Sequence, residues 1–551
     1  MAKPDLMKLN PRVAVLLPLL LAAAFFCIPL YLAHVYPASF WTKTDYEPLG
    51  LADAMSMAYR LADLQLYYAL GLTNHPGVPF YFLAWIALAL TGHPIAWNDS
   101  GFFRDVLDHV EQYHLMIRIL AAIVGAAGVY IFSRAALRLV PAGVVVAGVL
   151  LWLVSTPFTL ETFISAGIDS FALILNALFL AVLIPLAYED DVDPYLLVLA
   201  GFVGALAYLN KLSYIYIPIA LYAAVFVKIF GNGIGWRRHF RLMAVYFGSL
   251  LLVVYSALFL VLGRDTMRDL YNFQIGVFWG TGLYGTGDQT IVSGSALRHA
   301  LTSIPGDHTY SMLIALIGGS CLAIGGLLTW WRRPQHLPAA VIAIATGDAA
   351  ALSALFVLKH YGGHYTAGVA ATLPTCVVAG YLLLSAWGVR LRLSRLAGGA
   401  IAVASAVAIL LLAVEVQPAV TAQLATQALR TQQAETDWQE IKKYMANDPR
   451  NFEFGYRTPL GEYGEGFVVG SASVPRMTYE YFQSRTRIDS SPLTKFISRD
   501  IGVYVLDKQY FPTVEAIKRA DNISLINPSP VKFKDGDKLI ELKTVFLLFR
   551  S

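Results

Sequence analysis

The chain has 551 residues, of which 57% are hydrophobic and only 14% are charged. Soluble globular proteins have about 45–50% apolar and about 25% charged residues, so this composition excludes a soluble protein and predicts one that crosses a membrane many times. A formal net charge of +4 on so long a chain gives no indication of a nucleic-acid surface. The three cysteines all lie within apolar runs, which excludes a disulfide-stapled fold.

Apolar runs long enough to cross the bilayer core as helices, at about 20 residues each, predict about 11 spans. They lie at 12–33, 115–133, 142–160, 169–187, 195–210, 213–230, 241–263, 309–331, 338–358, 365–387 and 398–415. The first run lacks the cleavage site of a signal peptide and is expected to remain as an anchor. The shorter run at 77–91 follows Pro76 and contains Pro79, so it is expected to be an interfacial or re-entrant helix.

Basic residues predict the orientation of these spans. Lys3, Lys8 and Arg12 precede the first span, which places the N-terminus in the cytoplasm. The later short loops that contain arginines also fall on the cytoplasmic side, provided that the run 77–91 does not cross the membrane. The large segments then fall outside: a first loop at 34–114 and a second at 264–308 within a membrane domain of residues 1–415, followed by a tail at 416–551. We therefore expect the function on the outer side.

The tail has the pattern of a small α/β domain. Strands are predicted at 467–470 and 502–506, helices at 474–484 and 513–519, and a strand or hairpin at 538–549.

Two carboxylates, Asp45 and Glu47, stand just beyond the end of the first span among aromatic residues. They are suited to a general base or a metal ligand. On position alone, however, solvated loop charges beside an interfacial aromatic belt of Trp41 and Tyr46 are the simpler interpretation.

Two further charged residues are expected on the same outer face. Asp169 lies where one span begins, and the simplest role for it is that of helix N-cap. Lys211 interrupts an apolar stretch between two short helices. An ionisable group at membrane depth often marks a pathway or ligand site, while snorkelling of the amine to the interface is the alternative.

Further donors suited to an anionic group occur at other outer positions, namely His364, Tyr365 and Arg264. The side chains of His109, Glu111 and His114 are of types that bind metals, but their spacing matches no familiar metal site. No metal ligand is therefore assigned.

The order of these features resembles the GT-C glycosyltransferases of the protein O-mannosyltransferase and aminoarabinose-lipid A transferase kind. The resemblance covers roughly residues 10–390. It rests on Asp45 and Glu47, then Asn74-His75-Pro76, then the outer Asp169, then Leu209-Asn-Lys211, and last His364-Tyr365.

This resemblance implies an all-α polytopic membrane protein with the GT-C fold and a C-terminal periplasmic α/β domain. It also implies an inverting enzyme of the bacterial inner membrane, which moves a sugar from a polyprenyl-phosphate donor to a lipid, glycan or protein acceptor at the periplasmic face. No cofactor is required, and a divalent cation is left open.

The resemblance also implies residue roles. Asp45 is the expected base, and Glu47, beyond Tyr46, is the alternative. Asp169 would orient the acceptor or help position the base. The phosphate of the donor lipid is expected to contact cations and hydrogen-bond donors. The candidates are Lys211, His75, His364, Tyr365 and Arg264.

Two other classes of function are the alternatives to a transferase. A transporter would show paired halves with broken helices and ionisable residues inside its spans. A non-catalytic export or scaffold protein would also explain a large outer tail.

Overall fold

A computed structural model describes residues 11–35, 77–90, 109–164, 168–279, 293–359, 361–388, 395–448, 450–454, 501–508, 511–523 and 530–551. The contacts divide the chain into two units. The first contains the described parts of Met1–Leu32, Thr73–Phe80 and Arg118–Thr421, and the second those of Ala33–Leu72, Tyr81–Ile117 and Ala422–Ser551.

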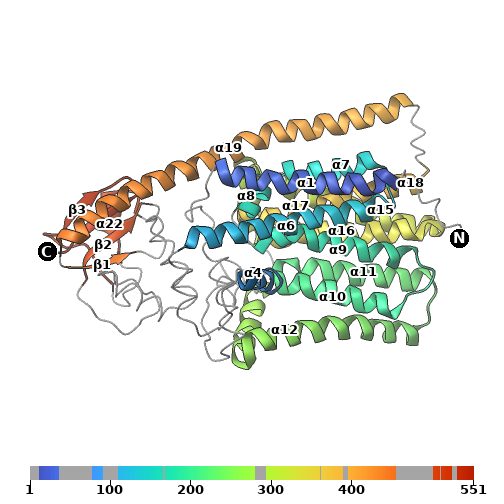
Figure 1. The fold of residues 1–551 in the computed structure, drawn as a ribbon. Helices are drawn as coiled ribbons and strands as arrows, with labels where there is room; N and C mark the ends of the chain where they lie inside the picture. Colours follow the sequence, from blue (N-terminus) through green and yellow to red (C-terminus); the bar gives the residue numbers. More distant parts are fainter. Residues whose placement is uncertain are drawn as a thin grey trace. The chain divides into compact units, whose positions relative to one another are not determined.

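The first unit is a bundle of helices that run along a common direction (Figure 1). Its helices are α1 (Pro11–Val35), α6 (Val110–Ala136), α7 (Ala142–Val154), α8 (Phe158–Ile164), α9 (Ala172–Tyr188), α10 (Pro194–Asn210), α11 (Tyr216–Gly231), α12 (Trp236–Trp279), α13 (Gly294–Asp307), α14 (Ser311–Leu313), α15 (Gly319–Arg332), α16 (Leu337–Lys359), α17 (Thr366–Ala370) and α18 (Leu373–Ala386). The division falls inside four helices: the first unit contains α1 as far as Leu32, α4 (Val78–Leu90) as far as Phe80, α6 from Arg118 onward and α19 (Arg395–Asn447) as far as Thr421.

Short helical segments of other types connect several of these helices. They are η1 (Ile168–Phe171), η2 (Leu212–Ile215), the π-helical η4 (Ile314–Gly318), η5 (Pro334–His336) and η6 (Gly363–Tyr365).

Within the described part of the chain, eight helical segments are long and apolar enough to cross a membrane. Each coincides with a span expected from the sequence. Two more expected spans form the shorter apolar helices α7 and α10, and the last lies in the first part of α19. The polytopic helical fold predicted from composition is therefore confirmed.

Small residues let α15 and α16 approach closely. A Cβ atom on Gly347 would lie 2.5 Å from the backbone nitrogen of Ala323 and 2.5 Å from the carbonyl oxygen of Gly319. One on Gly319 would lie 2.8 Å from the Gly347 carbonyl oxygen. Helices in lipid gain stability from such backbone contact, because apolar side chains alone find equal partners in the lipid tails.

Much of the segment 264–308, expected as an outer loop, is helical. The helix α12 continues without a break to Trp279, and α13 occupies Gly294–Asp307. The sequence contains neither Gly nor Pro between Arg264 and Ile275, so it carries no signal that ends the helix entering from the span.

The second unit contains a four-stranded sheet of order β1-β2-β4-β3 (Figure 1). Its strands are β1 (Asn451–Phe454), β2 (Ile501–Asp507), β3 (Lys538–Glu541) and β4 (Val545–Phe549). The pair β1–β2 is parallel, whereas β2–β4 and β3–β4 are antiparallel.

The sheet is covered on both faces. The end of α19 packs Trp438 and Ile441 against one face, and α22 (Val514–Arg519) packs Ile517 against the other. The strand at 502–506, the helix at 513–519 and the hairpin at 538–549 are therefore confirmed, whereas β1 was not expected. The elements expected at 467–470 and 474–484 lie outside the described residues.

Candidate active site

A buried ion pair lies at one end of the helix bundle. The Oδ2 atom of Asp169, in η1, accepts a hydrogen bond from Nζ of Lys211 at 2.7 Å, and its Oδ1 atom accepts one from the Tyr214 hydroxyl. The side chains of Lys211 and Asp169 are 2% and 12% exposed. Both carboxylate oxygens are therefore engaged, and the amine of Lys211 is almost completely removed from solvent.

The expected N-cap role of Asp169 is wrong. The residue at the N-cap of α9 is Phe171, and it makes no side-chain capping bond. Asp169 instead accepts a hydrogen bond from the amine of Lys211, which is 42 residues further along the chain. A full charge at hydrogen-bond distance attracts a buried carboxylate more strongly than a neutral backbone N–H group does.

The backbone at the end of α10 places Lys211 in this position. The helix ends at Asn210, Lys211 adopts an extended conformation with φ −159° and ψ 137°, and η2 begins at the next residue. The ring of Tyr365, in η6, then lies 4.4 Å from Nζ, a cation–π distance. The structure thus brings together three of the predicted site residues: Asp169, Lys211 and Tyr365.

A glycine makes room for the third partner of this group. A Cβ atom on Gly368, in α17, would lie 2.8 Å from Cε1 of Tyr214. The close approach of α17 to η2 therefore holds the Tyr214 ring in place, with its hydroxyl directed to the carboxylate.

Asn210 joins the same group to two other segments. Its Nδ2 atom donates to the Ile168 carbonyl at 3.1 Å, and its own carbonyl accepts from the Gly77 N–H at 2.9 Å. Gly77 is left-handed, with φ 55°, and stands two residues after the candidate His75. The start of α4, η1 and the end of α10 are therefore fixed to one another.

Some buried polar atoms near these residues have no hydrogen-bond partner among the residues that the structure describes. They are the carboxamide oxygens of Asn176 and Asn210 and the hydroxyl of Ser170. Asn176 uses its amide nitrogen to donate to the Tyr216 hydroxyl at 3.0 Å. This end of the bundle therefore has acceptor capacity that the described residues do not use.

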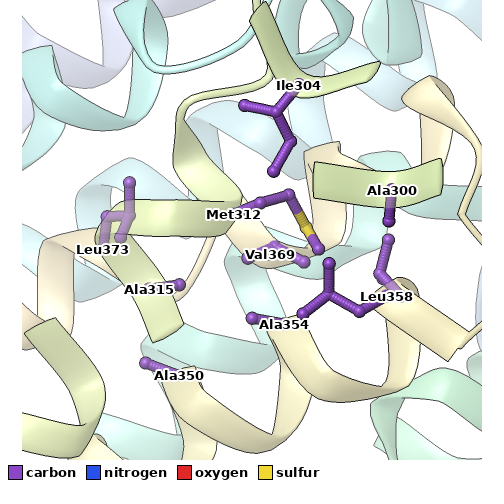
Figure 2. Close-up of a cluster of buried hydrophobic side chains, with 10 residues drawn as sticks. Ala300, Ile304, Met312, Ala315, Ala350, Ala354, Leu358, Val369 and Leu373 are labelled. Atoms are coloured by element: carbon purple, nitrogen blue, oxygen red, sulfur yellow. The ribbon is translucent and has the colours of Figure 1, made fainter. Parts of the chain in front are cut away.

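An apolar cluster supports the segment that carries Tyr365. Figure 2 shows the Met312 side chain reaching between Ile304, Val369 and Leu358, and Tyr365 packs against this cluster from the edge. The next residue, Thr366, is hydrogen-bonded to Thr156 at 2.9 Å. The position of the aromatic ring over Lys211 is thus set by packing.

A second polar group fixes the other side of the same turn. The hydroxyl of Tyr361 donates to Asp307 at 2.8 Å and lies 2.8 Å from the Thr309 hydroxyl. Burial raises the pKa of Tyr361 above its ordinary value, so its hydroxyl stays protonated as a donor.

The other predicted site residues are not placed here. Asp45, Glu47 and His75 lie outside the described residues. His364 belongs to η6 and Arg264 to α12, but their side chains are not described. The described residues contain no group of three or more His, Cys, Asp or Glu side chains arranged to hold a metal ion.

Sequence reasoning missed Tyr214 and Asn210. Asn210 stands beside Lys211 within an apolar stretch, and a polar amide at membrane depth was an available signal. Tyr214 carries no such signal, because a tyrosine in an apolar helix is ordinary core.

No family model matches the sequence, and no curated protein matches it. The chain is similar to a solved structure described as the crystal structure of ArnT from Cupriavidus metallidurans bound to undecaprenyl phosphate. The match covers 98% of each chain, with 15% sequence identity and a TM-score of 0.49.

Proposed function

We propose that this integral membrane protein is a GT-C-type glycosyltransferase, which moves a sugar from a polyprenyl-phosphate donor to an acceptor at the periplasmic face of the inner membrane. The observation that carries this proposal is the buried group formed by Asp169, Lys211 and Tyr214, with Tyr365 over the amine. Three of these residues, Asp169, Lys211 and Tyr365, belong to the series of sequence features that resembles the GT-C enzymes.

The chemistry of such a transfer suits a buried cation. The leaving polyprenyl phosphate takes up negative charge as the bond to the sugar breaks, and a preorganised donor in a site without water stabilises that charge strongly. Lys211 is a compact cation held at 2.7 Å from its counter-ion and 4.4 Å from an aromatic ring. We assign it to the phosphate of the donor.

The base is assigned elsewhere. Asp169 already accepts hydrogen bonds on both oxygens, and taking a proton would break its pairing with Lys211. We therefore assign Asp169 to positioning Lys211, and keep Asp45 as the base with Glu47 as the alternative. In a single displacement the base takes the proton of the acceptor hydroxyl. The oxygen of that hydroxyl attacks the anomeric carbon of the sugar, and the polyprenyl phosphate leaves. General base catalysis of this kind contributes about 10²–10⁴-fold.

The test is mass spectrometry of polyprenyl-phosphate glycolipids in membranes of the native host. Cells with the wild-type protein are compared with cells carrying Asp45→Asn or Asp169→Asn at matched expression. One glycolipid is expected to accumulate in each variant, and its mass identifies the sugar class. Asp190→Asn, which changes an exposed acid in the loop between α9 and α10, is the matched control and should leave the glycolipids unchanged.

A purely structural ion pair gives a different result. Lys211→Met leaves Asp169 buried without its counter-ion, which costs about 3–5 kcal/mol of stability. The double variant Asp169→Asn/Lys211→Met removes both charges and should regain much of that stability. If transfer returns together with stability, the pair only holds the fold and the proposed role of Lys211 is wrong.

One observation favours a transporter as the second candidate. Asp348 lies within the apolar span formed by η5 and α16, where an ionisable side chain is costly and often marks a transport pathway. Ion-coupled or substrate-coupled uptake that is lost in Asp348→Asn, with unchanged glycolipids in all the variants above, would support this candidate.

A further inference from the structure

A cluster of aromatic side chains lies where α11 ends and α12 begins. We name it the Trp236 cluster; it consists of Phe226, Phe230, Trp236, His239 and Phe240. The rings of Trp236 and His239 are stacked, with centroids 5.4 Å apart and an interplanar angle of 1°, and Phe240 lies 4.4 Å from Trp236. Trp236 and Phe240 are nevertheless 64% and 54% exposed, so the cluster presents a large apolar surface outward.

Three exposed arginines accompany this cluster: Arg237, Arg238 and Arg241. Arg238 is engaged, because it binds both carboxylate oxygens of Asp191, at 2.6 Å and 2.5 Å. The hydrogen bond from Arg238 also holds the pKa of Asp191 below its ordinary value, so the acid stays charged.

Arg237 and Arg241 have no ion-pair or hydrogen-bond partner among the side chains that the structure describes. They are four residues apart on α12 and therefore lie on the same helix face, about one turn from each other. The first turn of this 44-residue helix contains no acidic residue. Both guanidinium groups, and the positive end of the helix dipole, are thus available to an anion.

A buried nitrogen points to a ligand independently of the arginines. His239 is only 6% exposed, and its Nδ1 atom has no hydrogen-bond partner among the described residues. Its ring is stacked against Trp236, so this nitrogen belongs to the same cluster.

We propose that the Trp236 cluster, with Arg237 and Arg241, binds an anionic phospholipid of the surrounding membrane. Guanidinium groups pair with phosphate oxygens, and tryptophan prefers the depth of the lipid headgroups. The exposed rings of Trp236 and Phe240 then contact the upper acyl chains. An anionic lipid is favoured over a zwitterionic one because it brings no ammonium group to oppose the two arginines.

This site is separate from the candidate active site. The 16 residues of α11 lie between the two, a length of about 24 Å at 1.5 Å per residue. The lipid site therefore does not depend on the proposed transferase activity, and each can fail without the other.

Native mass spectrometry of the full-length protein tests the proposal. The detergent-solubilised protein is titrated with phosphatidylglycerol or with phosphatidylcholine. The wild type should bind phosphatidylglycerol more tightly than it binds phosphatidylcholine. Each of Arg237→Gln and Arg241→Gln should weaken that binding about fivefold, which corresponds to about 1 kcal/mol for one arginine near lipid phosphate. His239→Phe keeps an aromatic ring and should also weaken it.

Arg138→Gln is the matched control, since Arg138 is an exposed arginine in the turn between α6 and α7. It should bind phosphatidylglycerol as the wild type does. Melting temperatures in detergent without added lipid show whether each variant is folded, and Arg241→Gln alone tests the proposal if Arg237→Gln is not folded. Equal binding of the two lipids, an equal loss in Arg138→Gln, or displacement of the lipid by inorganic phosphate alone would overturn the proposal.

Discussion

The hydroxyl of Tyr214 is the neutral partner of the buried Asp169 carboxylate, and removing it leaves the charge pair intact. In Tyr214→Phe the ring still contacts Gly368, but one carboxylate oxygen loses its donor. A hydrogen bond to a charged group is worth about 1.5–3 kcal/mol, so we expect glycosyl transfer in isolated membranes to fall about tenfold or more. The melting temperature should fall by less than in Lys211→Met, which leaves the carboxylate without its counter-ion.

Tyr222→Phe is the control for this prediction. Tyr222 lies in α11 and contacts Phe226 and Phe247 through its ring. Its variant should transfer sugar at the wild-type rate. An equal loss in both variants would mean that any tyrosine hydroxyl in the bundle matters, and the special role of Tyr214 would have to be given up.

At the scale of single residues, the sequence indicated the charged members of the site but not their pairing. Asp169, Lys211 and Tyr365 stand out because polar residues interrupt apolar runs at the ends of spans. Their contact depends on which helices are neighbours, and partners 42 residues apart in the chain leave no local pattern. The N-cap prediction for Asp169 was wrong for the same reason. Capping involves only neighbouring residues in the chain, whereas the partner of Asp169 is the distant Lys211.

Helix packing gives a prediction at the next scale. In Gly347→Ala the new methyl group would stand 2.5 Å from backbone atoms of α15, so the two helices must move apart. Overpacking of this kind costs about 1–3 kcal/mol. We expect a lower melting temperature in detergent, measured by intrinsic tryptophan fluorescence.

Gly248→Ala provides the comparison. Gly248 also lies within a long helix, α12, but a Cβ atom there would meet nothing within 4 Å. Alanine is a better helix former than glycine by about 1 kcal/mol, so this variant should match or exceed the wild-type melting temperature. If the Gly347→Ala protein is as stable as the Gly248→Ala protein, α15 and α16 move apart without a loss of stability, and the prediction is wrong.

The elements themselves were largely predictable, because long apolar runs specify spans whatever their neighbours. Two features were not. The extension of α12 to Trp279 passes through a polar segment, where hydropathy gives no helix signal. The strand β1 has four residues, too few for an alternating pattern to stand out, and it is defined by its pairing with β2.

A buried carboxylate anchors the sheet of the second unit. Asp437, on α19, is 2% exposed and accepts from the backbone N–H groups of Lys543 and Thr544 and from the Thr544 hydroxyl, in the turn between β3 and β4. In Asp437→Asn the charge is lost and the amide cannot serve all three donors, which costs about 1–3 kcal/mol. We expect faster amide hydrogen exchange in β3 and β4.

Asp535→Asn, in an exposed turn of the same unit, should leave that exchange unchanged. Exchange in α9, α11 and α16 should be unaffected in both proteins, because these helices belong to the other unit. Faster exchange throughout the chain in Asp437→Asn would contradict a local role for this carboxylate.

For the whole molecule, composition alone predicted the membrane-embedded helical fold, and short strand and helix patterns predicted the α/β character of the tail. The boundary at residue 415, between the expected membrane domain and the expected tail, stays a prediction. The first of the two units ends within α19, at Thr421, three residues after Pro418.

The pairing of Asp169 with Lys211 also bears on how the chain enters the membrane during synthesis. The acid precedes α9 and the amine follows α10, so both charges stand at the same end of one helical hairpin. A charge that must cross lipid alone is costly, whereas a neutralised pair is much less so. Because the hairpin carries both partners, it can pass through the insertion machinery as a unit with its charges already matched, before any later helix is made.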